Sequence, residues 1–200
     1  MESDQFLTIA SESEGFFKEK GSKFLSFAFQ VSTEKEIKAH LTHLKEKYYD
    51  ARHHCYAFIT GIEKDFYRGS DAGEPKHSAG DPILNVIRSQ NLTNVLIVVI
   101  RYFGGTKLGV SGLINAYQEA AADALRHNQV IVETIRDVYE IDYPYELTNV
   151  VMKLIHDYQI EIKAQEFKEN CSMKLAVRAS LSEGVKEILN AHEKIFMRAV

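Results

Sequence analysis

A run of six apolar residues, VLIVVI at 95–100, constrains the fold more than any other feature of the sequence. The run is rich in β-branched residues and lacks the alternation of a strand with one solvated face. Such a run is typical of a strand that is buried on both faces. The glycine-rich segment RYFGGTKLGVSGL follows at 101–113, and then comes a helical pattern that ends near Asn128. The sequence therefore predicts a buried strand, a glycine-rich turn and a helix in direct succession.

Length and composition indicate a folded protein of one or two domains. Its 200 residues are 45% hydrophobic and 26% charged with only 3 Pro, which excludes disordered and low-complexity classes. The net charge of −4 provides no global positive field for nucleic acid or membranes, so any nucleic-acid site has to be a local patch. Cys55 and Cys171 are too few for a disulfide framework and suit a reducing compartment.

Neither a secretory signal nor a membrane span is predicted. The first 17 residues, MESDQFLTIASESEGFF, lack a basic segment followed by an apolar one. The longest apolar run, at 95–100, is too short to cross a bilayer. We therefore expect a cytoplasmic protein with no membrane partner.

The hydrophobic pattern restarts near residue 135, which predicts an α+β protein of two domains, residues 1–135 and 136–200. In the first domain, a helix is expected over about 34–48 with Thr33 as its N-cap. A second helix is expected to open at Asp81-Pro82, with Asp81 as N-cap and proline at the first helical position. FYRGS at 66–70 is expected to pair as a hairpin with the strand in ARHHCYAFIT at 51–60.

The second domain shows the order strand, helix, strand, strand, helix. This order predicts a small open-sheet domain of ferredoxin-like character. Its middle strands are expected in IEIKAQEF and SMKLAVRA, with Glu169-Asn170 in the turn between them.

The glycine-rich turn is the first candidate binding site. Glycines before a helix let backbone N–H groups face an anion, and the helix dipole favours negative charge there. Neither GxxxxGK[ST] nor GxGxxG is present, and the alternative interpretation is a tight connection whose glycines serve packing. The residues assigned to phosphate or nucleic-acid binding are Arg101, Gly104, Gly105, Lys107, Gly109 and Ser111.

The second candidate is the loop GSDAGEPKHSAGDP at 69–82, which is too rich in Gly and Pro for a regular element. Asp71 and Glu74 are candidate Mg²⁺ ligands or an acid–base pair. We favour a structural role, in which their carboxylates accept hydrogen bonds from the backbone of the turns. A charged side chain at the end of a buried strand has to reach the rim of the sheet or pair with an acid, and Asp71 or Glu74 is the candidate partner if Arg101 forms a structural ion pair.

The third candidate is the segment HHCYAF at 53–58, in which His53 and Cys55 share a strand face and resemble half of a zinc site. His77 is the only third ligand to nominate, so a small core residue is the favoured interpretation of Cys55. Nucleophilic catalysis by Cys55 with His53 or His54 is disfavoured because adjacent residues of a strand point to opposite faces. We expect no catalytic residue, no metal and no cofactor.

Basic side chains from separate segments meet in one cleft if the helices after the two loops pack on one sheet. Residues 51–111 hold 7 Lys and Arg against 5 Asp and Glu, plus three His, which predicts a local basic patch. Besides Arg101 and Lys107, the candidate cleft-lining residues are Arg52, His53, Asp71, Glu74 and His77.

Three segments resemble those of the IMPACT/YigZ family. GDPILNVIRSQNLTNVLIVVIRYFGGTKLG at 80–109 resembles the family signature almost position for position, and HHCYAF at 53–58 and SDAGEP at 70–75 resemble its flanking blocks. The resemblance covers roughly residues 15–130. KHSAG at 76–80 departs from the smaller Ser, Gly and Thr residues of many members, so no role is carried over to Lys76 or His77.

The resemblance implies an N-terminal α/β domain of ribosomal-protein-like type with a left-handed βαβ crossover, where the default is right-handed. It also implies a C-terminal domain similar to a domain of elongation factor G. Eukaryotic IMPACT proteins regulate translation by competing for the activator of an initiation-factor kinase. They carry an additional N-terminal module, so that mechanism is not transferred to this chain.

We therefore expect a protein that binds structured RNA or the ribosome and its translation machinery, with a phosphate at the glycine-rich turn. One alternative is a small-molecule enzyme that handles a phosphorylated ligand at the same turn. The other is a protein–protein adaptor whose motif is purely structural. Binding is favoured over catalysis because no complete nucleophile–base or metal set is present. The oligomeric state is left open.

Overall fold

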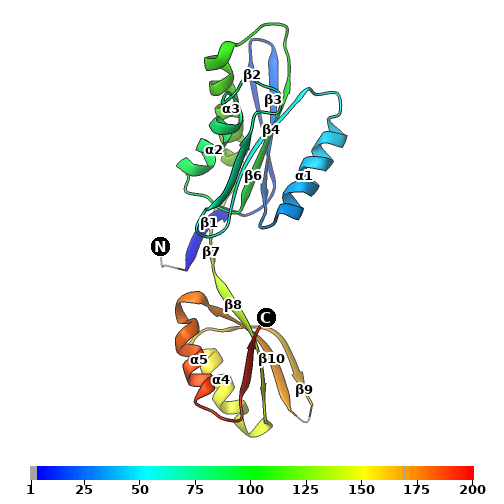
Figure 1. Cartoon of the computed structure of the whole chain (residues 1–200). Coiled ribbons are helices and arrows are strands. Elements are labelled where there is room, and N and C mark those ends of the chain that lie inside the picture. Colours follow the sequence, from blue (N-terminus) through cyan, green and yellow to red (C-terminus); the bar gives the residue numbers. More distant parts are fainter. Residues whose placement is uncertain (1–3, 169) are drawn as a thin grey trace. The chain divides into compact units, whose positions relative to one another are not determined.

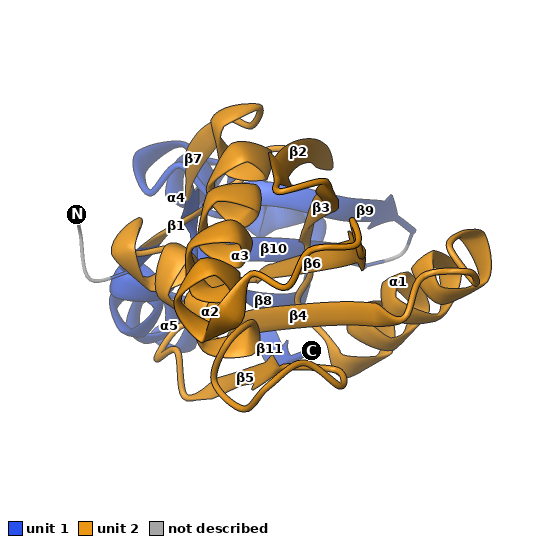
Figure 2. Cartoon of the chain, turned by 90° about the horizontal axis from the view of Figure 1, so that it is seen from above, with its two compact units in different colours: residues 1–5, 133–200 blue, residues 6–132 orange. Residues whose placement is uncertain are grey.

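The computed structural model describes residues 4–168 and 170–200, and the chain forms two compact units. Figure 2 colours the larger unit, residues 6–132, orange and the smaller, residues 1–5 with 133–200, blue. The division at 132/133 lies close to residue 135, but Asp4 and Gln5 group with the C-terminal third of the chain. Asp4 explains this grouping, because its carboxylate accepts hydrogen bonds from the Arg178 guanidinium and the Ser180 hydroxyl.

The larger unit is a five-stranded sheet in the order β2-β3-β6-β4-β5, and every neighbouring pair is antiparallel. Helices α2 and α3 cover one face and helix α1 covers the other (Figure 1). A separate two-stranded sheet joins β1 (Gln5–Ile9) to β7 (Val130–Thr134). The strands of the five-stranded sheet are β2 (Ser13–Glu19), β3 (Ser22–Gln30), β4 (His53–Thr60), β5 (Phe66–Ser70) and β6 (Val95–Tyr102). The helices are α1 (Glu34–Lys47), α2 (Gly80–Ser89) and α3 (Gly109–Arg126).

Strand β6 is buried on both faces, which confirms the prediction from its apolar run. Leu96, Val98 and Ile100 belong to the core under α1, whereas Ile97 and Val99 belong to the core under α2 and α3. Continuous apolar strands are typical of parallel sheets. Here helices on both faces bury the central strand of an antiparallel sheet, so the same pattern results.

Helix α1 begins where the sequence predicts. The Thr33 side chain accepts a hydrogen bond from the Glu36 backbone N–H, and the Glu36 carboxylate accepts one from the Thr33 N–H. This reciprocal arrangement is a capping box, which satisfies two backbone donors that the first helical turn leaves without partners. The hairpin of β4 with β5 is also confirmed, in a register that pairs Phe58 with Arg68.

The smaller unit is a four-stranded sheet in the order β11-β8-β10-β9, with all pairs antiparallel. Its predicted strands and helices are present, but the sequence pattern does not indicate the final strand, β11, because only four mostly exposed residues form it. The turn expected at Glu169-Asn170 includes Glu169, which lies outside the described residues. The elements are β8 (Arg136–Tyr143), 3-10 helix η1 (Tyr145–Leu147), α4 (Thr148–Asp157), β9 (Glu161–Phe167), β10 (Cys171–Arg178), 3-10 helix η2 (Ala179–Leu181), α5 (Ser182–Asn190) and β11 (Phe196–Ala199). Among the described residues of the chain, no helix is long and apolar enough to cross a bilayer.

Candidate functional site

Arg101, the last charged residue of β6, lies in a row of side chains across three strands. It pairs in register with Phe24 of β3 and with His53 of β4. Its guanidinium carbon is 5.5 Å from the centroid of the Phe24 ring and 5.7 Å from that of Phe103. Two aromatic rings therefore hold the guanidinium at the end of the sheet, at distances at which cation–π attraction is significant.

The Arg101 charge is buried and paired with Glu74. The nitrogen–oxygen distance is 2.6 Å, and the two side chains are only 7% and 4% exposed. Tyr117 of α3 donates its hydroxyl to the same carboxylate oxygen at 2.8 Å, and Arg101 also donates to the Ser22 hydroxyl at 3.4 Å. Of the two acids considered from the sequence, Glu74 is therefore the partner of Arg101.

Cys55 completes this buried network without acquiring the properties of a nucleophile. Its sulfur is 3.0 Å from the Asp71 carbonyl oxygen and 3.3 Å from the Tyr117 hydroxyl. Burial raises the pKa of the Cys55 thiol to about 12, so the reactive thiolate is not formed near neutral pH. Among the residues that the structure describes, no group of three or more His, Cys, Asp and Glu is placed to hold a metal ion.

Asp71 caps helix α2 from across the loop, which corrects the prediction that Asp81 opens this helix. The Asp71 carboxylate accepts hydrogen bonds from three backbone N–H groups, those of His77 at 2.8 Å, Ala79 at 2.9 Å and Gly80 at 2.9 Å. Asp81 lies inside the first turn, where its carboxylate contacts His77 Nδ1 at 2.6 Å. The hydrogen bonds expected between the Asp71 carboxylate and the turn backbone are therefore present.

The cap makes the stability of the larger unit sensitive to acid. Burial by itself would raise the pKa of Asp71, but the N–H groups of Gly80, His77 and Ala79 outweigh burial and lower this pKa below its usual value. A carboxyl group with a lowered folded-state pKa stabilises the fold above its unfolded pKa of about 3.9, and the stabilisation is lost as the pH falls through the folded-state pKa.

Asp71→Ala should lower the free energy of unfolding at pH 7 by about 1–2 kcal/mol, the usual cost of a lost N-cap. Urea unfolding at pH 7 and at about pH 3 measures the effect, and we expect the difference from the wild type to shrink in acid. Asp81→Ala is the control, with an expected loss below about 0.5 kcal/mol because the Asp81 side chain is 53% exposed. Equal losses for Asp71→Ala at both pH values would contradict the capping role.

Four of the seven predicted cleft-lining residues meet around one hollow of about 530 Å³ at the end of the sheet, and three do not. Asp71, Glu74 and His77 belong to the neighbouring loop and are not among the lining residues. The hollow, called here the Lys107 hollow, is lined by Asp50, Ala51, Arg52, His53, Arg101, Tyr102, Phe103 and Lys107.

The aromatic part of this lining is not among the predicted residues, although FGG at 103–105 directly after a buried strand indicates that Phe103 lies at the end of the sheet. Phe103 is 60% exposed, while the side chains of Arg52 and Lys107 are exposed beside it. Among the described residues, Asp50 is the only acid in the lining, and its carboxylate accepts a hydrogen bond from the Tyr102 hydroxyl at 2.7 Å. The hollow thus combines cationic and aromatic groups.

The glycines of the turn have two different backbone roles. A Cβ atom on Gly104 would lie 1.9 Å from the carbonyl carbon of Gly21, so Gly104 permits close packing on the β2–β3 turn. Its N–H donates to the Ser22 hydroxyl and is already occupied. Gly105 and Gly109 have φ of +89° and +72°, which only glycine adopts freely. Ser111 lies in the first turn of α3, exposed and not at the N-cap, which is Leu108.

Comparisons with known proteins agree with this architecture. Residues 20–125 match the model of the Impact N-terminal domain. The IMPACT family member YvyE of Bacillus subtilis is 28% identical over 95% of this chain and 89% of its own length. An IMPACT family member of Haemophilus influenzae is 31% identical over 79% of this chain and 78% of its own length. A crystal structure of a hypothetical protein has a TM-score of 0.72 at 23% identity, covers 98% of each chain, and shows the fold alone.

Proposed function

Because the chain belongs to the IMPACT family, we propose that it binds RNA or the ribosome in the regulation of translation, with phosphate contacts in the Lys107 hollow. The observation that carries this proposal is the convergence of Arg52, His53 and Lys107 with the exposed ring of Phe103 around one hollow. Cations that neutralise phosphates and aromatic rings that stack on bases are the two recurring groups of nucleic-acid sites.

The charges of the hollow support phosphate binding at Arg52 and Lys107. Within the described part of the chain, neither side chain forms an ion pair, and both are exposed. Arg101 contributes differently, because Glu74 neutralises its charge inside the core. We assign to Arg101 the positioning of Phe103 and of the 71–79 loop, and to Lys107 and Arg52 the phosphate contacts.

The proposal extends to the fold of each unit. In the larger unit, β3 and β4 both run antiparallel to β6, so α1 makes a crossover between two parallel strands. This βαβ unit supports the ribosomal-protein-like type that the family resemblance implies, for which we propose the left-handed crossover of that type. In the smaller unit, the element order βαββαβ supports a ferredoxin-like domain similar to a domain of elongation factor G.

Lys107→Ala should weaken RNA binding at low salt and reduce the slope of log affinity against log salt by about one unit, because one phosphate contact is lost. Fluorescence anisotropy with a labelled structured RNA, repeated over a range of salt concentrations, measures both effects. We expect the free energy of unfolding to change by less than about 0.5 kcal/mol, as for other surface substitutions.

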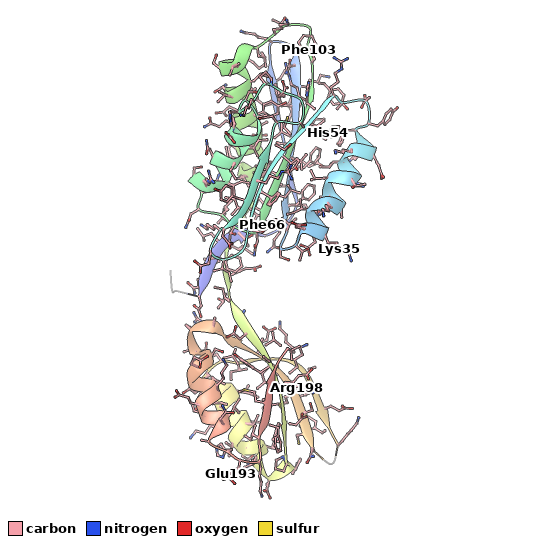
Figure 3. All side chains as sticks on the ribbon, in the orientation of Figure 1. Lys35, His54, Phe66, Phe103, Glu193 and Arg198 are labelled. Carbon is pink, nitrogen blue, oxygen red and sulfur yellow. The ribbon has the colours of Figure 1, made fainter. Side chains whose placement is uncertain are left out.

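Lys35→Ala is the matched control, since Lys35 is an exposed lysine of α1 at the other end of the unit (Figure 3). It removes the same charge and should leave the salt slope unchanged. Loss of stability in Lys107→Ala with an unchanged salt slope would show that the turn is architectural. Partner capture that is insensitive to nuclease and to Lys107→Ala would instead favour the protein adaptor.

A further inference from the structure

Packing within the larger unit does not explain why the Phe103 side chain is exposed. Its side chain is 60% exposed directly after the buried strand β6. The Arg101 guanidinium lies 5.7 Å from its ring centroid, and Glu74 and Ser22 in turn hold Arg101. The ring is therefore oriented by a buried network while much of its surface faces solvent. A ligand that stacks on the ring would lose little conformational entropy, because the ring is already positioned.

Phe103 also separates two hollows. Besides the Lys107 hollow, a second hollow of about 510 Å³ is lined by Phe16, Gly21, Lys23, Leu25, Tyr102 and Phe103. Tyr102 and Phe103 belong to both linings. The second hollow has its own exposed cation, Lys23, and within the described residues it has no acid in its lining. An aromatic ring thus stands between two hollows that each present a lysine.

We infer that this surface takes an unpaired segment of RNA, with one base stacked on Phe103 and the flanking phosphates near Lys107 and Lys23. This inference rests on the proposed function and names the form of nucleic acid bound. A base within a duplex is stacked on both sides and does not offer its face to a side chain, whereas an unpaired base does. Cations on both sides of the ring complement a chain of phosphates that passes over it.

The absence of tryptophan from the sequence makes a direct test of stacking available. Phe103→Trp introduces the only tryptophan of the chain, at the proposed stacking position. Its fluorescence should be quenched in a saturable way by a single-stranded RNA oligonucleotide and far less by the same strand annealed to its complement. Phe66→Trp is the matched control, because Phe66 is 44% exposed and lies on β5 at the opposite end of the sheet (Figure 3). Its fluorescence should not respond.

Phe103→Ala should weaken single-stranded RNA binding by about 5- to 150-fold, since stacking contributes about 1–3 kcal/mol per base. The salt slope should stay at the wild-type value, because no charge is removed. Circular dichroism checks that the exposed substitution leaves the fold intact, and Phe103→Trp should retain affinity.

The outcomes separate this inference from the proposed function. If Phe103→Ala binds RNA like the wild type while Lys107→Ala lowers the salt slope, the stacking inference fails and the phosphate site stands. Equal affinity of single-stranded and duplex RNA also overturns the inference. If neither substitution alters binding, both the inference and the proposed phosphate site fail.

Discussion

Glu74→Ala should lower the free energy of unfolding by about 3–5 kcal/mol, the usual cost of removing one partner from a buried ion pair. The substitution leaves the Arg101 guanidinium in a site where it is only 7% exposed. It also removes the acceptor of the Tyr117 hydroxyl, which is itself fully buried. Arg101 Nε already has no hydrogen-bond partner within the described residues, so the site has no spare acceptor for the uncompensated charge.

Urea unfolding followed by circular dichroism at neutral pH measures this loss. The double variant Glu74→Leu with Arg101→Met removes both charges and should recover most of the stability, since apolar side chains often replace a buried pair without cost. Glu63→Ala is the control, because Glu63 is exposed in the loop before β5, and it should change stability by less than about 0.5 kcal/mol. A loss below about 1 kcal/mol for Glu74→Ala would show that the core tolerates the lone guanidinium.

After Glu74→Ala, Gly104→Ala should have the largest effect on stability. We expect it to lower the free energy of unfolding by about 3 kcal/mol, at the upper end of the range for overpacking. The added Cβ would lie 1.9 Å from the Gly21 carbonyl carbon and 2.1 Å from the Ser22 nitrogen. Both are backbone atoms, so the clash cannot be relieved by a side-chain rotation. The glycine-rich turn and the β2–β3 turn have to separate, which also disturbs the hydrogen bond from the Gly104 N–H to Ser22.

Two other glycines serve as controls for this prediction. A Cβ on Gly105 would meet nothing within 4 Å, so Gly105→Ala should cost only the strain of its positive φ, about 1 kcal/mol. Gly184 in α5 has open space and no positive φ, and Gly184→Ala should stabilise the protein by about 0.5–1 kcal/mol. Thermal unfolding of the three variants tests the order. Equal effects of Gly104→Ala and Gly105→Ala would show that the two turns separate at little cost and that close packing does not require glycine at 104.

The aromatic and charged parts of the site depend on one another through Arg101. Its guanidinium contacts Phe103 on the surface and Glu74 in the core. We therefore expect a substitution of Glu74 to affect the proposed stacking surface indirectly, through Arg101. We therefore expect a substitution of Lys107, but not one of Arg101, to weaken RNA binding without lowering the stability of the fold.

The sequence by itself determined those features that depend only on residues close together in the chain. The apolar run at 95–100 specified a strand buried on both faces, and Thr33 with Glu36 specified the start of α1. The glycines after β6 indicated a sharp turn before a helix, and the turn is there. Each of these features depends on hydrophobic period or on side-chain contacts within one turn, which a single stretch of sequence contains.

Only the tertiary structure decided the contacts that cross between elements. Glu74 pairs with a residue 27 positions away, and Asp71, not Asp81, caps α2 because the loop folds back onto the helix N-terminus. Gly104 meets Gly21, and Phe103 stands between two hollows, because β3 and β6 are neighbours in the sheet. Periodicity specifies which face of an element is buried, but it does not specify which partner lies opposite. That choice depends on strand order and register, which the packing of the whole sheet sets.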